Sequence, residues 1–392
     1  MMRGREAALL ISRLQQFFKL DIATGVVLVA AAVLALILAN SLLAPMYGQF
    51  LDLPVVLQVG SLKLAKPLLL WVNDGLMAVF FMLVGLEVKR EVIEGDLSRL
   101  SVAALPAIAA IGGMVGPALI YLLCNITDPQ AMRGWAIPTA TDIAFALGVL
   151  ALLGSRVPSS LKTFLLALAI IDDLGAIIII AAFYTSDLSV MALELAGVGV
   201  AVLIAFNLMG VTRRAAYILV GIFLWVCVLK SGIHATLAGV IVGLAIPLRA
   251  KDGGSPLHSL EHDLSPWVNF GVLPIFAFTN AGVRLLDIGL ADLVHPVQLG
   301  IGLGLLVGKQ CGVMGSVWLA LRLRLGALPD QVSWRQMYGV ALLTGIGFTM
   351  SLFIATLAFP AEAYDADVRV MVLFASVISA VCGYVVLFRA SR

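Results

Sequence analysis

The chain has 392 residues, of which 61% are apolar and 12% charged, and its mean hydropathy is +1.07. Soluble globular proteins contain about 25% charged residues, so this composition excludes a soluble domain. It predicts a single all-helical integral membrane domain over residues 1–392. The net charge of +2 gives no reason to expect a nucleic-acid partner. The four cysteines lie in or beside apolar stretches without metal-ligand spacing, so we expect neither disulfides nor a cofactor site.

Two segments near the N-terminus are expected outside the membrane. Residues 1–21 mix leucine and phenylalanine with arginine and lysine, which predicts a cytoplasmic amphipathic segment at the membrane surface or, alternatively, a disordered tail. Residues 50–68 contain PVVLQV and LKLAK on either side of Gly60 and Ser61. A glycine at the first position of a two-residue turn is typical of a β-hairpin. We therefore predict a small extramembrane hairpin, with an irregular loop as the alternative.

Twelve apolar stretches approach or exceed the length of about 20 residues that spans a bilayer. They fall at residues 22–42, 70–90, 103–124, 133–154, 162–184, 190–210, 214–230, 232–248, 267–284, 296–321, 336–359 and 366–388. Of the 25 basic residues, eighteen lie in segments on the side of the N-terminus, six lie on the other side, and Lys309 lies within a span. Because basic residues concentrate in cytoplasmic loops, we expect both termini in the cytoplasm and the hairpin in the periplasm.

The fourth and eleventh spans contain residues that weaken helices. In AIPTATDIAFALG, Pro138 lacks a backbone N–H, and Thr141 and Asp142 follow with side chains that can bind freed backbone groups. In LLTGIGFTMS, Gly345 and Gly347 make unwinding easy, although a glycine pair also suits close helix packing. The two breaks are the middle members of spans 3–5 and 10–12. This pattern predicts inverted repeats, crossing interrupted helices 4 and 11, and the binding site of a transporter.

Two adjacent acids, Asp172 and Asp173, lie at the middle of the fifth span. One carboxylate at the bilayer centre costs about 2.5–3.5 kcal/mol, so a pair predicts a functional site. The two residues point about 100° apart around a helix, and we expect Asp173 to face a water-accessible funnel and Asp172 a neighbouring helix. Lys309, in the tenth span, is deep enough to pair with Asp172 unless its side chain reaches the membrane surface. Where two interrupted helices cross, Asp142 would suit the facing positive helix ends and Lys309 the negative ends.

A buried pair of carboxyl groups can hold either protons or a small cation. Burial and a like-charged neighbour both favour the protonated form of a carboxyl group, so protons and a cation would compete for one site. Ca²⁺ prefers six to eight oxygen ligands, and we therefore expect a monovalent cation at Asp172 and Asp173. A scaffold that opens alternately to either side would exchange protons for this cation. Two acids allow more than one proton per ion, which would let the membrane potential drive the exchange.

Five motifs together resemble the bacterial Na⁺/H⁺ antiporter family of the NhaA type: PTATDIAFALG, LAIIDDLGAIIII, SGIHATLAGV, LEHDLSPWVNFGVLPIFAFTNAGV and GIGFTMS. The resemblance runs from the first span to the last. It implies an electrogenic Na⁺(Li⁺)/H⁺ antiporter of the bacterial inner membrane, not an enzyme, whose partners are membrane lipid, Na⁺, Li⁺ and H⁺. It assigns the ion and proton site to Asp172 and Asp173, supported by Thr141, Asp142 and Lys309.

The resemblance also implies regulation by pH near the cytoplasmic mouth and a homodimer joined through the hairpin at residues 50–68. The positions that match the pH response are Glu87, Glu91, His234, Glu261, His262 and Gly347. Ser265 departs from the family pattern, which has a second histidine at this position. We expect a changed pH threshold or steepness as the result.

Two other classes of protein place acids in a membrane. An intramembrane aspartyl protease resembles a pattern with its two acids on different helices and a G-x-G-D motif, and this sequence has neither. A Na⁺-coupled symporter of an organic solute needs a roomier pocket, and no arginine within the predicted spans is free to clamp an anionic solute. Both classes are therefore less favoured than the antiporter.

Overall fold

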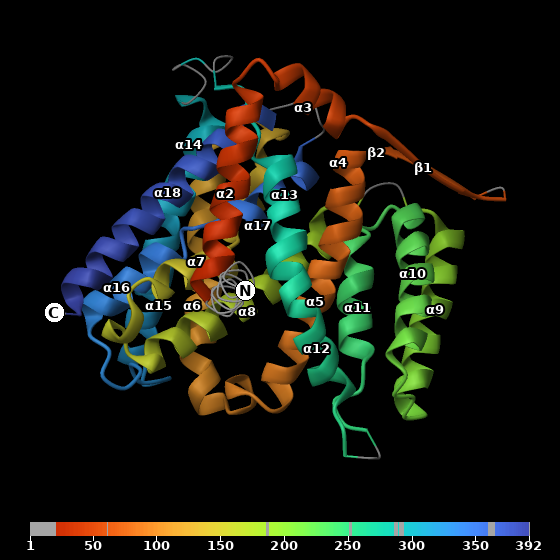
Figure 1. Cartoon of the computed structure of the whole chain (residues 1–392). Helices are drawn as coiled ribbons and strands as arrows, with labels where there is room; N and C mark the ends of the chain where they lie inside the picture. The colour runs from red at the N-terminus through yellow and green to blue at the C-terminus, as the bar shows by residue number, and fades with distance from the viewer. Residues whose placement is uncertain are drawn as a thin grey trace, which may run out of the picture.

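The computed structural model describes residues 21–60, 62–185, 188–250, 253–285, 289, 294–359 and 365–391. Helices dominate this part of the chain, and a two-stranded sheet projects from one end of the bundle (Figure 1). The helices and strands are α2 (Asp21–Ala39), α3 (Ala44–Leu51), β1 (Pro54–Val59), β2 (Leu62–Pro67), α4 (Leu68–Trp71), η1 (Val72–Leu76), α5 (Met77–Ile93), η2 (Asp96–Ser98), α6 (Leu100–Cys124), η3 (Ala131–Thr139), α7 (Ile143–Ala151), η4 (Gly154–Arg156), α8 (Ser159–Phe183), α9 (Val190–Leu208), α10 (Arg214–Ser231), α11 (Thr236–Ala245), α12 (Pro256–Trp267), η5 (Val268–Val272), α13 (Leu273–Asn280), α14 (Pro296–Leu303), η8 (Gly304–Gly308), α15 (Lys309–Arg322), α16 (Trp334–Leu343), α17 (Phe348–Ala358) and α18 (Asp365–Ala390). The predicted amphipathic segment 1–21 lies outside the described residues, except for Asp21.

Within these ranges, nine helices are long and apolar enough to cross a membrane, or ten if α16 and α17, bent by 44°, form one span. They coincide with ten of the twelve predicted spans. The predicted span 232–248 is helical only over α11, because Gly232 takes a left-handed conformation (φ 86°) and ends α10. The predicted span 267–284 falls in the continuous helix α12–η5–α13, where asparagines at 269 and 280 interrupt the apolar pattern. The prediction of a polytopic helical membrane protein is confirmed, and the number of twelve spans stays a prediction.

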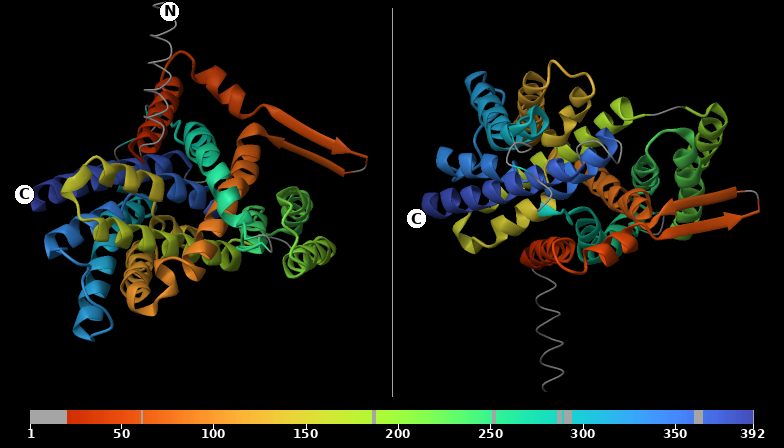
Figure 2. Two further views of the ribbon diagram at one scale, coloured as in Figure 1. Left: turned by 60° about the horizontal axis from the view of Figure 1, so that its bottom comes forward. Right: turned by 90° about the horizontal axis from the view of Figure 1, so that it is seen from above.

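The predicted β-hairpin is present. Strands β1 and β2 pair antiparallel, and Val59 lies opposite Leu62, which leaves a two-residue turn. Gly60 has a φ of 60°, the conformation that such turns require of their first residue and that glycine adopts without strain. The hairpin extends beyond the helices in both views of Figure 2.

Two contacts fix the base of the hairpin to the bundle. The Lys66 ammonium group lies 2.7 Å from a carboxylate oxygen of Asp74 in η1. The Trp71 indole N–H donates to the Val55 carbonyl over 3.1 Å. The hairpin therefore has a defined direction relative to α4 and α5.

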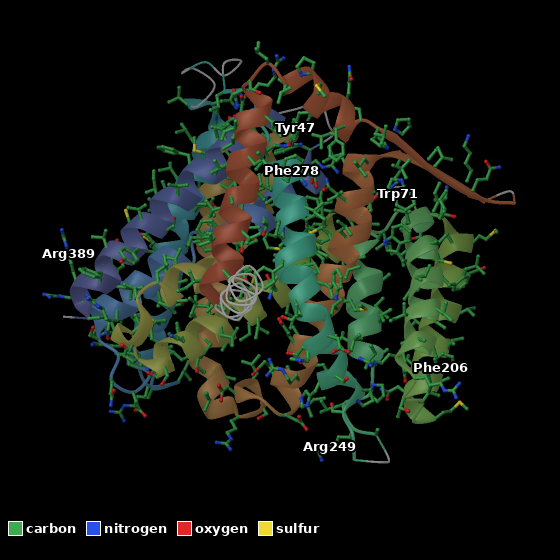
Figure 3. All side chains as sticks on the ribbon, in the orientation of Figure 1. Tyr47, Trp71, Phe206, Arg249, Phe278 and Arg389 are labelled. Carbon is green, nitrogen blue, oxygen red and sulfur yellow. The ribbon has the colours of Figure 1, made fainter. Side chains whose placement is uncertain are left out.

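On the same end of the bundle, α3 is anchored to α13 through Tyr47. Its hydroxyl donates to the Phe278 carbonyl over 2.6 Å, and the two rings meet edge to face at 5.4 Å (Figure 3). Burial raises the pKa of Tyr47 to about 12, so its hydroxyl stays a hydrogen-bond donor at neutral pH. This contact helps to fix the position of α13 beside α2.

Glycines bring α6 and the helix α14–η8–α15 into backbone contact. A Cβ atom on Gly312 would lie 2.0 Å from the Gly112 carbonyl oxygen, and one on Gly116 would lie 2.4 Å from the Gly308 carbonyl oxygen. Gly315, three residues further along α15, has no neighbouring atom within 4 Å of such a Cβ. Small residues at membrane-helix interfaces allow this close approach. The packing encloses Lys309, the first residue of α15, completely.

Candidate functional site

Two non-helical stretches meet at the centre of the bundle. The chain leaves helical geometry between η3 and α7 and again between α16 and α17. The Asp142 N–H donates to the Ile346 carbonyl over 2.7 Å, and the Thr141 hydroxyl donates to the Thr344 carbonyl over 3.0 Å. Because buried backbone groups must be paired, each interruption supplies partners for the other.

The Asp142 carboxylate caps two helices at once. Its Oδ1 accepts from the Phe145 N–H over 2.9 Å at the start of α7. Its Oδ2 accepts from the Thr349 N–H over 3.1 Å and from the Thr349 hydroxyl over 2.5 Å at the start of α17. The N-terminus of a helix carries a partial positive charge, so a single anion stabilises both helix starts.

Lys309 lies at the other side of this crossing and contacts two predicted site residues. Its ammonium group lies 2.7 Å from Asp172 Oδ2 and donates to the Thr141 hydroxyl over 2.9 Å. The side chains of Lys309 and Asp172 are 0% and 1% exposed, so this ion pair is fully buried. The π-helical turn η8 comes immediately before Lys309; such turns are frequent at functional sites. Through Thr141, Lys309 is linked to the end of α16, because the Thr141 hydroxyl donates to the carbonyl of Thr344, the residue that follows α16.

Asp173 takes no part in the ion pair of Lys309 with Asp172, and it borders a cavity. Its side chain is 1% exposed, and neither carboxylate oxygen has a hydrogen-bond partner among the residues that the structure describes. Because buried polar groups are normally paired, these two oxygens can accept a ligand that enters the cavity. The cavity has a volume of about 160 Å³, and its polar lining residues are Thr24, Glu87, Asp142, Asp173, Asn269 and Thr349.

Most residues that match the predicted pH response gather at the end of the bundle opposite the hairpin. The Arg90 guanidinium group lies 3.0 Å from Glu261 and 2.6 Å from Glu91, which joins α5 to α12. Glu87, one helical turn before Glu91, lines the cavity beside Asp173. The side chain of His262, in α12, is exposed on the surface of the protein.

His234 lies apart from this group, in the turn between α10 and α11. Lys230, at the end of α10, donates to the Lys63 carbonyl in β2 over 3.5 Å, so this turn belongs to the hairpin end of the bundle. The structure therefore does not bring His234 together with the acids of α5 and α12.

The two remaining positions lie near the cavity. Gly347 precedes α17 at the interruption, and its carbonyl accepts from the Ser351 N–H in the first turn. Ser265, which departs from the family pattern, accepts a hydrogen bond over 3.2 Å from Asn269, and Asn269 lines the cavity.

Sequence reasoning missed several hydroxyl groups that hold the crossing together. Ser351 donates to the Ile137 carbonyl over 2.6 Å, and Ser376 of α18 accepts from the Phe348 N–H over 3.1 Å. Thr344, Thr349 and Ser351 flank the glycines of LLTGIGFTMS, and the argument applied to Thr141 would have found them. Ser376 is 28 residues from its partner, and nothing local in the sequence points to it.

Comparison with known proteins gives one consistent result. The sequence profile of the family described as Na⁺/H⁺ antiporter 1 matches residues 15–387. A Na⁺/H⁺ antiporter NhaA of Rhodospirillum rubrum is 60% identical over 386 residues, which cover 96% of each chain. The NhaA antiporter of Pseudomonas putida strain GB-1 is 58% identical over 380 residues, covering 96% of this chain and 97% of the relative. These helices, this buried site and these matches lead to one conclusion: the chain belongs to the NhaA family of Na⁺/H⁺ antiporters.

Proposed function

We propose that this protein is an electrogenic antiporter that expels Na⁺ or Li⁺ from the cytoplasm in exchange for protons, and that Asp172 and Asp173 form its ion and proton site. The observation that carries the proposal is the unequal environment of the two acids. Asp172 is engaged by Lys309, whereas Asp173 presents both oxygens to a cavity. Asp173 is thus ready to receive an ion, whereas Asp172 is held at one of its two oxygens by Lys309.

The exchange follows from the number of charges that the site can hold. Na⁺ that enters the cavity meets Asp173 first, and Asp172 adds its carboxylate once Lys309 releases it. On the other side of the membrane, protons take the place of Na⁺ on the two carboxylates. Two protons exchanged for one Na⁺ move one net charge, so the membrane potential would contribute about 2.3 kcal/mol per 100 mV.

A layer of aromatic rings lies on the hairpin side of the site. The Phe353 ring of α17 lies 5.6 Å from that of Phe81 in α5 and 6.2 Å from that of Phe276 in α13. All three side chains are at most 1% exposed. Phe353 is one helical turn, about 6 Å, beyond Thr349, which lines the cavity. These rings support a seal on the hairpin side while the cavity serves the opposite side.

A polar layer follows the rings. The side-chain amides of Asn73 and Asn280 bond reciprocally over 3.3 and 2.9 Å, and both are buried. Arg369 of α18 donates to the Asn280 carbonyl over 3.3 Å and so ties α18 to α13. Amides that separate can bond to water instead, which suits a contact that opens and closes.

Replacing Phe353 with alanine is expected to open this seal. The truncation removes the ring that bridges α5 and α13, and comparable core truncations cost about 3–5 kcal/mol. Everted vesicles with this variant should hold a smaller respiration-driven ΔpH before any cation is added. Phe353→Leu should keep the seal, and Phe374→Ala, whose ring is 59% exposed on α18, is the matched control. A normal resting ΔpH in Phe353→Ala vesicles that contain wild-type amounts of protein would refute the seal.

We further propose twelve spans, with inverted repeats in spans 3–5 and 10–12, and both termini in the cytoplasm of a bacterium whose inner membrane holds the protein. Helix α11 and the helix α12–η5–α13 would supply the eighth and ninth spans. The excess of basic residues at the end opposite the hairpin supports this orientation. Regulation by pH would act at that end, through Glu87 and the cluster of Arg90, Glu91 and Glu261.

The hairpin supports a proposed homodimer. It extends beyond the helices (Figure 2), and Leu53, Val56 and Leu57 are each more than half exposed. An exposed two-stranded ribbon also offers unpaired backbone groups along its edges, which favour pairing with another strand. A second copy of the hairpin would cover both features.

Cation-induced changes of ΔpH in everted vesicles test the transport proposal. Adding Na⁺ or Li⁺ should dissipate a respiration-driven ΔpH, and K⁺ should not. The rate should fall when the potential is collapsed, because exchange moves net charge. Transport should also fall at acidic pH, because protonated carboxyl groups do not hold Na⁺. A ΔpH that resists Na⁺ at every pH would overturn the assignment, and a rate indifferent to the potential would overturn electrogenicity.

A further inference from the structure

A groove lies where the start of α16 packs beside the end of α18, far from the transport site and at the end opposite the hairpin. Its volume is about 390 Å³, and it is lined by Trp334, Arg335, Tyr338, Val386, Arg389 and Ala390. The two helices pack closely behind it, since a Cβ atom on Gly339 would lie 2.5 Å from the Leu387 side chain. The groove is therefore a defined feature of the α16–α18 interface.

The groove carries two positive charges, and no acid of the described residues lines it. Arg335 and Arg389 are both exposed, no carboxylate lines the groove, and neither arginine forms an ion pair within the described ranges. Three other arginines near this end, Arg90, Arg214 and Arg249, each pair with an acid. In Figure 3, Arg389 projects from the outer edge of the bundle. Two free guanidinium groups on one groove suit a phosphate, which they bind with directed hydrogen bonds.

Apolar surface continues from the groove along α18. Val385, Val381 and Val377 precede Arg389 at intervals of four residues and are 38%, 57% and 57% exposed. Residues four apart share one face of a helix. Trp334 and Tyr338, 42% and 40% exposed, stand beside the arginines, as amphipathic rings do at the level of lipid headgroups. A ligand that matches this surface has an anionic head and a hydrocarbon tail.

We propose that this groove binds the headgroup of an anionic phospholipid, with its phosphate between Arg335 and Arg389 and an acyl chain along the valines of α18. A soluble phosphate would use only the arginines, whereas a phospholipid would also place its acyl chain along the apolar stripe. The site is independent of the transport residues. Its position on the first turn of α16 means that a bound lipid would tie this half of the interrupted span to α18.

Native mass spectrometry of the purified full-length protein tests the proposal with phosphatidylglycerol and phosphatidylethanolamine as probes. Phosphatidylglycerol should be retained preferentially. Each arginine near an anionic lipid contributes about 1 kcal/mol, so Arg335→Gln with Arg389→Gln should weaken its binding about 30-fold. The matched control is Arg322→Gln with Arg324→Gln, which removes the same charge at the end of α15 outside the groove. Na⁺ transport should survive in both double variants, which shows that they fold.

Three results would overturn the proposal. Equal loss of phosphatidylglycerol in both double variants would mean that only the overall charge matters. Equal retention of the two lipids would exclude recognition of the anionic headgroup. Displacement of bound phosphatidylglycerol by millimolar inorganic phosphate would identify a site for soluble anions.

Discussion

Asp173→Asn is expected to abolish Na⁺-induced dissipation of ΔpH in everted vesicles while leaving the protein folded. Asparagine keeps the shape of the side chain but can neither accept a proton nor neutralise a cation. Breaking a buried charge pair costs about 3–5 kcal/mol. Loss of the Asp173–Na⁺ contact on this scale would weaken Na⁺ binding more than a hundredfold. Because neither Asp173 oxygen has a partner in the described part of the chain, the substitution breaks no hydrogen bond of the fold. Its effect should therefore fall on transport and not on stability.

Asp172→Asn should abolish exchange as well, but by a different route. This substitution removes the partner of Lys309 and should lower the thermal stability of the purified protein. Asp52→Asn, at an exposed position after α3, is the control and should leave transport unchanged. Retained Na⁺-dependent dissipation of ΔpH in both site variants would sink the assignment.

A double-mutant cycle that replaces Lys309 and Asp172 with neutral residues is expected to separate the role of the ion pair in stability from its role in transport. Lys309→Gln alone strands the Asp172 carboxylate in a fully buried position, and breaking a buried pair in this way costs about 3–5 kcal/mol. Lys309→Gln combined with Asp172→Asn leaves no charge behind and should recover most of the lost stability. The double variant should nevertheless remain inactive, because it retains one acid of the site.

Thermal unfolding in detergent and vesicle transport together read out this cycle. Additive loss of stability in the double variant would contradict a direct interaction between the two side chains. Recovered transport in the double variant would show that Asp172 is not an ion ligand. A Cys311→Ala variant, at an exposed position two residues along α15, controls for disturbance of the helix itself.

The features that follow from local chemistry could be predicted from the sequence. Gly60 supplies the backbone angle of a two-residue turn, and the hairpin register follows from it. The two interruptions could be predicted because proline and glycine weaken helices, and Pro138, Gly345 and Gly347 lie at these interruptions. Lys309 could be paired with Asp172 because a lone cation deep in an apolar span must find an acid.

Other features depend on contacts that no short stretch of sequence encodes. The helix of the eighth predicted span begins only after His234, because the turn between α10 and α11 takes up the preceding residues. The separation of His234 from Glu261 depends on how α10 and α12 are placed in the bundle. The contribution of Ser376 depends on α18 packing against the second interruption.

One carboxylate closing two helix starts has a mechanical consequence. Asp142 accepts three hydrogen bonds shared between α7 and α17, and hydrogen bonds to charged groups are worth about 1.5–3 kcal/mol each. Pulling the two half-helices apart would break both bonds to Thr349 and leave the buried Asp142 carboxylate with one of its three hydrogen bonds. The crossed half-helices α7 and α17 are therefore expected to move as one rigid unit whenever either of them moves.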